Sequence, residues 1–260
     1  MIALDNATLL RAVDTTAYRA SLLLRSASHP DEAAIGTWNV GETANHLSHC
    51  YSACIAPFEG TMDVAPEDID AHNEEVLAED PVRDLDVLAD RIDADAPKYL
   101  EIAEAAEPER IVEIFTGVHV PATAVSATLL GEALVHGYDI ARAEGLPWRI
   151  DPEHALLVME YLTPVSVHFV DPDAAAGLRA GYQIQLRGGP TQYWYVDDGE
   201  LTIQHCLGTP VDCHISADPV TMLLMAYNRV GPIMPSLTGK VRVWGRRPWM
   251  ALRLGGLFRT

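Results

Sequence analysis

The sequence of 260 residues is poor in basic side chains, with 18 lysines and arginines against 37 aspartates and glutamates and a formal net charge of −19 at pH 7. Because nucleic acids are polyanions, this balance argues against DNA or RNA as a partner. No apolar run is long enough to cross a bilayer, and the segment MIALDNATLLRAVD lacks the basic start and apolar stretch of a signal peptide. We therefore expect a cytoplasmic protein without a membrane span.

Cysteine is also scarce, and no two of the four cysteines have the Cys-x-x-Cys spacing. In a cytosolic chain we expect Cys50, Cys54, Cys206 and Cys213 to be reduced and partly buried. Cys50 follows His46 by four residues, so it is either a soft metal ligand, a reactive thiol or a small buried side chain, and the buried role is also expected of Cys54. The sequence contains neither internal repeats nor low-complexity segments.

The two signs of charge are unevenly distributed along the chain. Residues 59–95 contain fourteen acids and two bases, whereas residues 237–260 contain six bases and no acid. The acidic block is expected to be a solvated surface. The basic end either receives an anionic ligand or packs against the acidic half, and charge alone does not choose between these alternatives.

Apolar periodicity predicts four long helices in the first half, over residues 5–28, 39–60, 84–106 and 121–145. Asn39 followed by Glu42 resembles a capping box, and Pro121 suits the first turn of the fourth helix. Residues 61–82 are expected to form a loop or a short helix, and residues 111–120 to be extended. Four helices with one long connection predict a four-helix bundle, a fold that builds metal sites from inward-facing side chains.

The pattern changes after Trp148, and a domain boundary is expected there, which gives domains 1–148 and 149–260. Short alternating runs predict an antiparallel meander from strands at residues 182–188, 192–196, 200–206 and 211–216, with a further strand at 240–245. Helices are predicted at residues 152–168, 219–230 and 247–258. The second domain is therefore predicted to be a smaller α+β domain with an antiparallel sheet.

Glu132 and His136 are the residues that point most directly to chemistry. They lie four residues apart in a predicted helix, so their side chains share one face, about one turn apart. His46, on another predicted helix, offers a third ligand, and three protein ligands are typical of an open catalytic metal site. The competing interpretation is a surface pair or a core contact, but the apolar neighbours of Glu132 indicate a buried helix, in which both groups need partners.

Two segments together resemble the mycothiol-dependent maleylpyruvate isomerase family, whose N-terminal half is a DinB-like metal-binding bundle. These segments are 38-WNVGETANHL-47 and 132-EALVHGYDIARAEGLPW-148. The segments 212-DCHISADPVTMLLMAYNRV-230 and 238-TGKVRVWGRRPWMALRLGGLF-258 are similar to the sterol-carrier-like domain that often follows the bundle. The resemblance covers nearly the whole chain.

The resemblance implies that His46, Glu132 and His136 are zinc ligands, although two histidines and a carboxylate would also suit Ni²⁺ or Fe²⁺. It further implies a low-molecular-weight thiol cosubstrate, typically mycothiol, whose metal-bound thiolate acts as a nucleophile. In the isomerase reaction, the thiolate would add to a conjugated double bond and leave after rotation about the resulting single bond. In related enzymes the thiolate displaces a leaving group or conjugates an electrophile, so isomerase and S-transferase both remain open.

The residues that bind substrate are less clearly indicated. Arg83, Arg229 and Arg246 are candidate anchors for a carboxylate or a sugar-linked thiol, with surface or structural roles as the alternative. His49, one turn after His46, is a candidate general base or supporting residue, or else a core or surface histidine. Asp139, three residues after His136, is placed either to orient the imidazole of that ligand or to stabilise the helix.

Two other functions compete with the thiol-dependent enzyme. The second half could be a non-catalytic carrier of a hydrophobic ligand, lined by apolar residues such as Met222–Ala226, or those residues could simply form a helical core. A thiol-independent metal hydrolase or lyase is the third possibility. In each case we expect a small-molecule substrate or ligand and a monomer or homodimer.

Overall fold

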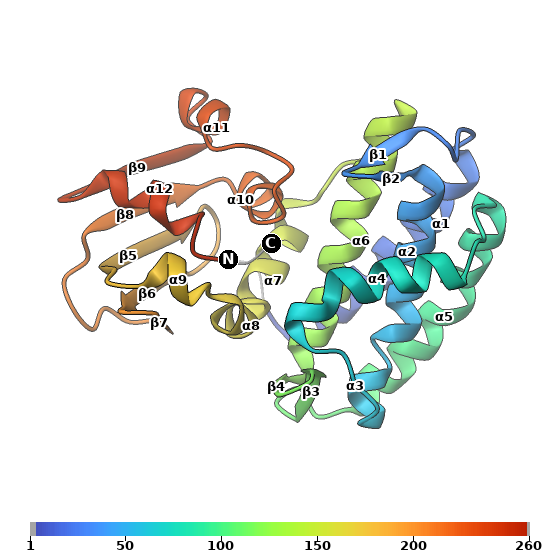
Figure 1. Cartoon of the computed structure of the whole chain (residues 1–260), viewed down its shortest axis with the longest axis horizontal. Helices are drawn as coiled ribbons and strands as arrows, with labels where there is room; N and C mark the ends of the chain where they lie inside the picture. The colour runs from blue at the N-terminus through green and yellow to red at the C-terminus, as the bar shows by residue number, and fades with distance from the viewer. Residues whose placement is uncertain (1–3, 259–260) are drawn as a thin grey trace. The chain divides into compact units, whose positions relative to one another are not determined.

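The computed structural model describes residues 4–258, which form two compact units (Figure 1). The first unit comprises Asp5–Ile150. The second unit runs from Asp151 onward and also includes Leu4, whose carbonyl accepts a hydrogen bond of 2.8 Å from the hydroxyl of Tyr161. Each unit buries its own set of apolar side chains.

Four long helices build the first unit: α1 (Asn6–Ser26), α2 (Val40–Ala53), α5 (Leu85–Ala105) and α6 (Ala122–Glu144). Helices α1 and α2 each pack against both α5 and α6, so the four helices enclose a common core (Figure 1). Leu47 of α2, Leu88 of α5 and Leu130 of α6 are fully buried in it. The predicted four-helix bundle is confirmed.

Shorter elements connect the bundle helices. They are β1 (Ala33–Ile35), β2 (Trp38–Asn39), α3 (Ala56–Glu59), the 3₁₀ turn η1 (Pro66–Asp68), α4 (Ile69–Glu79), β3 (Ile111–Phe115) and β4 (Val118–Pro121). The segment expected to be extended is a hairpin that turns at Gly117, where φ is +79°.

Side-chain caps fix where the bundle helices begin. Asn39 and Glu42 form the predicted capping box, with Oδ1 of Asn39 2.8 Å from the Glu42 amide and Oε2 of Glu42 2.9 Å from the Asn39 amide. Pro121 precedes α6 as its N-cap, one position before the expected first turn. Gly145 ends α6 in the left-handed conformation, with φ of +66°.

A five-stranded sheet forms the centre of the second unit. Its strands, in the order β7-β6-β5-β8-β9, are β5 (Arg179–Leu186), β6 (Thr191–Asp197), β7 (Glu200–Gln204), β8 (Cys213–Ala217) and β9 (Val241–Gly245). Strands β5, β6 and β7 form an antiparallel meander, as predicted. Tyr182, Trp194 and Ile215 lie on the face that packs into the core.

Strand β8 departs from the prediction. Instead of extending the meander beyond β7, it returns to the other side of β5 and pairs with it in parallel, with Tyr182 opposite Cys213 and Leu186 opposite Ala217. The sheet is therefore mixed: the pair of β5 and β8 is parallel, whereas the pair of β8 and β9 is antiparallel, like the pairs of the meander. Alternation of apolar residues marks a strand but carries no information about its direction or neighbour, so the sequence pattern could not reveal this crossover.

The helices of the second unit are shorter than predicted. They are α7 (Pro152–Tyr161), α8 (Thr163–Ser166), η2 (Val167–Phe169), α9 (Pro172–Ala175), α10 (Pro219–Ala226), α11 (Ile233–Leu237), η3 (Pro248–Met250) and α12 (Ala251–Leu254). The helix predicted at 152–168 breaks at Leu162, and the chain starts a new short helix, α8, with Pro164 in its first turn. Proline lacks the N–H that a helix interior needs but is tolerated in a first turn.

Two further predicted helices end early. The helix predicted at 219–230 stops at Ala226 because Asn228 adopts a left-handed conformation, with φ of +59°. The helix predicted at 247–258 is confined to Pro248–Leu254, and Gly255 and Gly256 follow it. Within residues 4–258, no helix combines the length and the hydrophobicity that crossing a membrane would require.

Candidate metal centre

Helices α2 and α6 carry the three side chains that the sequence predicts as metal ligands. His46 lies in the first half of α2, whereas Glu132 and His136 lie one turn apart on α6. Because the two helices pack against each other, the structure brings His46 to the α6 pair across a separation of 86 residues from Glu132.

The ligand atoms of these residues converge. Oε2 of Glu132 lies 3.1 Å from Nε2 of His136 and 3.4 Å from Nε2 of His46, and no two of the three ligand atoms are farther apart than 4.8 Å. Neighbouring ligands of a tetrahedral zinc with bonds of about 2.0–2.1 Å are separated by about 3.3 Å. The two distances to Glu132 are close to this value, so the donor set fits a divalent transition metal.

The centre is organised around the negative charge of Glu132, which is partly buried. Burial lowers the pKa of His46. Burial acts the same way on His136, but Asp139 and Glu132 outweigh it and raise the pKa of His136 to about 9. Burial also opposes ionisation of Glu132, yet the two histidines hold its pKa well below the usual range. The carboxylate is therefore ionised, and His136 carries the compensating charge when no metal is bound.

Asp139 supports His136 from the side away from Glu132. Its Oδ2 lies 3.4 Å from Nδ1 of His136, and its side chain is fully buried. The contact is electrostatic, because Nδ1 has no well-formed hydrogen bond to any of the described residues. A carboxylate behind the imidazole fixes the ring and leaves Nε2 free to bind a metal, which is the first of the two roles that the sequence suggests for Asp139.

Trp38 covers the histidines. Its ring centroid lies 5.0 Å from that of His46 and 6.4 Å from that of His136. The indole N–H donates a hydrogen bond of 2.7 Å to Oε1 of Glu74 on α4, which anchors the tryptophan. Sequence reasoning did not assign Trp38 a contact with the site, although it lies in the WNVGETANHL segment; Glu74 gave no signal within the acidic block.

Gly137, directly after His136, allows a tryptophan to pack against α6. A Cβ atom at this position would lie 2.3 Å from Cζ2 of Trp148, which is too close for any side chain. The Trp148 indole in turn donates a hydrogen bond of 2.9 Å to the carbonyl of Leu134. This close packing holds the turn of α6 that carries His136, and it explains why histidine is followed by glycine here.

Cys50 lies on α2 with His46, and Cys54 is the C-cap of that helix; neither belongs to the group of three ligand atoms. Sγ of Cys50 lies 3.5 Å from Nε2 of His46, so Cys50 borders the centre. Burial raises the pKa of Cys50 well above its usual value and that of Cys54 to about 12. In the absence of metal, both side chains are therefore neutral thiols.

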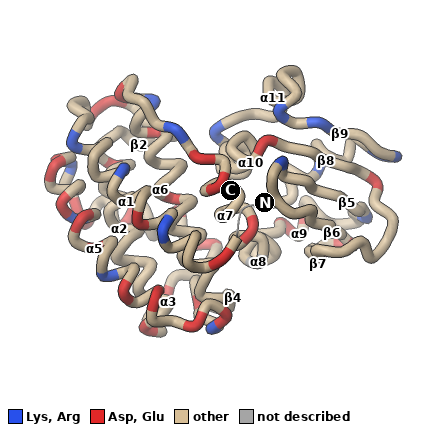
Figure 2. Tube along the Cα trace, turned by 180° about the vertical axis from the view of Figure 1, so that it is seen from behind, with Lys and Arg blue, Asp and Glu red and all other residues tan. Residues whose placement is uncertain are grey.

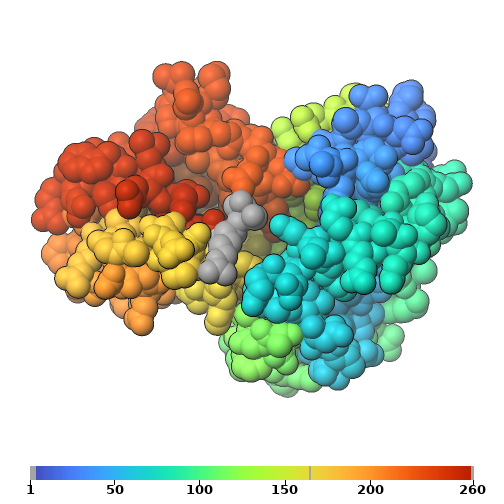
Figure 3. All heavy atoms as spheres, in the orientation of Figure 1, coloured from blue at the N-terminus to red at the C-terminus, as the bar shows by residue number. Residues whose placement is uncertain are grey.

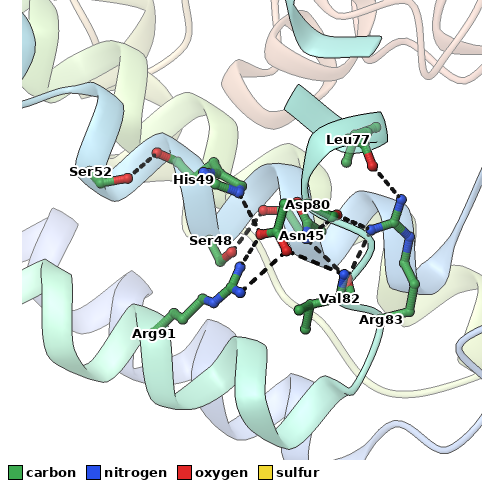
Figure 4. A network of polar contacts seen from close by, with 9 residues as sticks. All are labelled: Asn45, Ser48, His49, Ser52, Leu77, Asp80, Val82, Arg83 and Arg91. Atoms are coloured by element: carbon green, nitrogen blue, oxygen red, sulfur yellow. Dashed lines mark hydrogen bonds and ion pairs between the residues drawn. The ribbon is translucent and has the colours of Figure 1, made fainter. Parts of the chain in front are cut away.

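His49, a candidate general base, belongs to a separate polar network (Figure 4). Its Nε2 lies 2.9 Å from Oδ2 of Asp80, and Asp80 also forms an ion pair with Arg91 of α5. The hydrogen bond from Arg91 is the main reason why the pKa of Asp80 lies well below its usual range. Asn45 completes the network by donating its side-chain amide to the carbonyls of Asp80 and Val82, at 3.3 and 3.0 Å.

Arg83 stabilises the backbone of the same loop. Its guanidinium donates hydrogen bonds to the carbonyls of Leu77, Asp80 and Val82, at 2.8–3.0 Å (Figure 4). Arg83 therefore braces the connection between α4 and α5 internally, whereas His49 fastens that connection to α2. The structure does not bring either side chain into the group of three ligand atoms.

The other two candidate arginines belong to the second unit. Arg229 donates a hydrogen bond of 2.6 Å to the carbonyl of Tyr227. Arg246 bonds Oδ1 of Asp212 through Nε at 3.2 Å and a terminal nitrogen at 2.5 Å. Arg246 and Asp212 line an open cavity of about 550 Å³ at one end of the sheet, together with Arg179 and Tyr195.

Both halves of the chain match known families. Residues 24–141 match the mycothiol maleylpyruvate isomerase N-terminal domain, and residues 168–259 match the SCP-2 sterol transfer family. No curated protein is significantly similar to the chain.

Solved structures share the fold at low sequence identity. A crystal structure of the mycothiol-dependent maleylpyruvate isomerase is 14% identical, with a TM-score of 0.58 and 93% of each chain covered. A histidine-to-alanine mutant of that isomerase is 13% identical, with a TM-score of 0.57 and the same coverage. The chain also spans 24% of the length of the sec-alkylsulfatase Pisa1 from Pseudomonas sp., at 15% identity, 54% coverage of this chain and a TM-score of 0.38. By these two family matches, the chain resembles the mycothiol-dependent maleylpyruvate isomerase family through its N-terminal domain over residues 24–141, followed by an SCP-2-like domain over residues 168–259.

Proposed function

We propose that the chain is a metal-dependent enzyme, with zinc as the preferred metal, that uses a low-molecular-weight thiol such as mycothiol to isomerise or S-transfer a small electrophilic substrate. The observation that carries this proposal is the convergence of a partly buried carboxylate and two imidazole nitrogens within 4.8 Å. The family of residues 24–141, and the likeness of the fold to a mycothiol-dependent maleylpyruvate isomerase, support the thiol and the isomerisation.

His46, Glu132 and His136 would hold the metal, which when bound supplies the positive charge that keeps the sulfur of the thiol deprotonated at neutral pH. Three protein ligands rather than four are typical of catalytic sites, because they leave a coordination position for a reactant. Asp139 holds the imidazole of His136 in place, and Trp38 shields the histidines from solvent on one side.

Isomerisation and S-transfer begin with the same nucleophile. In isomerisation, sulfur forms a bond to one carbon of a conjugated C=C bond, and the electron pair moves onto the conjugated carbonyl group. Rotation about the resulting C–C single bond and elimination of the thiol then give the other geometric isomer, with the thiol regenerated. In S-transfer, the new C–S bond remains in the product: either a leaving group departs with the electron pair of its broken bond to carbon, or a proton quenches the enolate that addition forms. The donor set is compatible with both reactions.

Metal content per chain is the first test of this proposal. We expect about one zinc per chain in the purified protein and a loss of most of it in His136→Ala. His119→Ala is the matched control, because His119 is an exposed histidine on β4. Inductively coupled plasma mass spectrometry also identifies Ni²⁺ or Fe²⁺ if either takes the place of zinc. A folded protein that binds no divalent metal after zinc addition would contradict the proposal.

Thiol dependence is the second test. We expect the metal-loaded protein to convert a cis-configured conjugated acid, or to conjugate an electrophile, only when mycothiol or another small thiol is present. Turnover that is equally fast without any thiol would instead favour a metal hydrolase or lyase.

The SCP-2 match supports a second candidate, a carrier of a hydrophobic ligand in residues 168–259. Native mass spectrometry of the purified chain distinguishes the two functions. A copurified apolar ligand that is retained in His46→Ala, together with no thiol-dependent turnover, would favour the carrier. Thiol-dependent turnover that is lost in His46→Ala would favour the enzyme.

A further inference from the structure

Exposed apolar side chains are concentrated in one short segment of the second unit. Twelve large apolar side chains are exposed among the described residues, and seven of them lie in residues 233–252. Three of the seven belong to α11, where Ile233, Met234 and Leu237 are 72%, 64% and 76% exposed. Contiguous exposed apolar surface of this kind is uncommon in soluble proteins and marks a site of interaction.

Helix α11 protrudes from the surface of the second unit. Figure 1 shows it as a separate turn of helix next to the edge strand β9, and in Figure 3 the orange-red atoms of this region protrude from the surface. Pro235 is the one buried residue of the helix, so Pro235 anchors it while the other side chains point outward. A protruding apolar helix suits a partner that can deform around it, whereas a rigid protein surface would need a matching groove.

The charge around α11 is opposite to that of the whole chain. Residues 219–260 contain seven bases and no acid, although the formal net charge of the chain is −19. Figure 2 shows the basic positions at the foot of α11 and along β9. This segregation of positive charge is independent of the apolar exposure, and both features occur in the same segment.

Three bases are tied to the foot of α11 by contacts. Lys240 lies three residues after the last residue of α11 and is exposed. The guanidinium of Arg242 lies about 4.0 Å from the position that a Cβ of Gly239 would take. Arg187 donates a hydrogen bond of 2.9 Å to the carbonyl of Lys240. The backbone amide of Asp218 donates a hydrogen bond to the same carbonyl of Lys240. The carboxylate of Asp218 instead accepts hydrogen bonds from Thr221 and caps α10, so it forms no ion pair with these three bases.

Trp244 extends the same edge of the sheet. It is 49% exposed on β9 and stacks on His214 of β8, with ring centroids 5.4 Å apart and the planes 8° from parallel. An indole held at a surface beside arginines is typical of the boundary between lipid headgroups and acyl chains, where tryptophan is enriched. We call Ile233, Met234, Leu237, Lys240 and Arg242 the basic apolar surface.

We propose that the basic apolar surface docks on a lipid bilayer rich in anionic headgroups. The apolar side chains of α11 enter the interface between headgroups and acyl chains, while Lys240, Arg242 and Arg187 contact the anionic headgroups. Apolar burial and electrostatic attraction reinforce each other in this arrangement, and peripheral anchors commonly need two such signals. The docking would bring the second unit to a membrane without any spanning segment.

Sedimentation with vesicles tests this proposal. The full chain is mixed with vesicles of equal parts phosphatidylglycerol and phosphatidylcholine, or with phosphatidylcholine alone. We expect binding to the anionic vesicles only, and at least about a tenfold weaker binding in Ile233→Ser/Met234→Ser/Leu237→Ser, because each apolar side chain contributes to insertion. Lys240→Gln/Arg242→Gln should weaken binding by about fivefold for each charge removed.

A matched control uses exposed apolar residues elsewhere. Ile111→Ser/Leu207→Ser changes two side chains that are each 61% exposed, and it should bind vesicles like the unaltered protein. Since the residues replaced in α11 are exposed, the triple variant should keep its melting temperature, which differential scanning calorimetry checks.

Three results would overturn the proposal. They are no binding of the unaltered protein to anionic vesicles, equal binding by the α11 triple variant, and equal binding to phosphatidylcholine alone. A dimer of the unaltered protein that the triple variant abolishes, without vesicle binding, would instead identify the surface as an interface between two copies of the chain.

Discussion

Helix α2 carries two histidines, three residues apart, that lie in contrasting polar clusters. His46 meets Glu132, whose other neighbour is His136, whereas His49 meets Asp80, whose other neighbour is Arg91. In the second cluster a guanidinium provides a permanent positive charge for the carboxylate. In the first cluster the positive charge is a proton on His136, which a metal ion can replace.

The comparison shows how the same residue types acquire different roles. A carboxylate that already has an arginine partner holds the structure together, and Figure 4 shows Asp80 in that position at the loop between α4 and α5. A partly buried carboxylate with only imidazole partners retains ligand atoms that a cation can use. We therefore keep metal binding at the cluster around Glu132 as our proposal and expect a structural role for the cluster around Asp80.

The largest expected effect is in Glu132→Gln. Glu132 is the only carboxylate among the three proposed ligands, so removing its charge should reduce zinc affinity by more than about 100-fold. This exceeds the range seen when a residue that only contacts a ligand is replaced. Isothermal titration calorimetry with zinc measures the change, and Asp80→Asn is the matched control that should keep the unaltered affinity. Comparable losses in both variants would remove the distinction between the clusters.

Asp139→Asn should have a smaller effect on the same quantity. The amide keeps the size of the side chain but removes the charge that faces Nδ1 of His136, so zinc affinity should fall by about 10- to 100-fold. The pKa of His136 in the metal-free protein should also fall, because Asp139 is one of the groups that raise it, and NMR titration measures this pKa. An unchanged pKa would show that Asp139 only stabilises the helix.

Arg91→Met should affect stability rather than metal binding. It removes the ion pair of a half-buried arginine and leaves His49 as the side chain that still contacts the Asp80 carboxylate, so unfolding by urea should require about 1–2 kcal/mol less free energy. Zinc stoichiometry should stay the same. Loss of zinc with retained stability would reverse the two roles.

The loss of unfolding free energy at acid pH should also depend on the cluster around Asp80. The pKa of Asp80 is lowered by folding, so its contribution is complete above the unfolded value of about 3.9 and is lost as the pH falls below that value. Asp80→Asn should therefore flatten the decline in unfolding free energy below about pH 4. Urea titrations of the metal-free protein across this range measure the slope, and equal slopes for both proteins would exclude this contribution.

Local sequence patterns predicted much of the bundle and its centre. The spacing of Glu132 and His136 predicted a shared helix face, and the capping box at Asn39 and Glu42 predicted where α2 begins. These features depend on neighbours within one turn of helix, which the sequence displays directly. The choice of His46 as the third ligand also drew on a family motif.

Features that depend on distant partners were not predictable. The roles of His49 and Arg83 follow from contacts with the loop around Asp80, and nothing in the residues beside His49 indicates that loop. The parallel pairing of β8 with β5 depends on how the chain returns across the sheet. The exposure of α11 was hidden as well, because a short apolar run looks the same in sequence whether it is buried or not.

The crossover to β8 also has a consequence for the order of folding. Strands β5, β6 and β7 can pair as they leave the ribosome, since each hydrogen-bonds to its predecessor. β8 must instead find β5 across the intervening hairpins, and β9 can add only afterwards. Because such non-local pairing is slow, the nascent second unit should leave one side of β5 unpaired until β8 arrives, which makes that temporary edge a place where a chaperone would be useful.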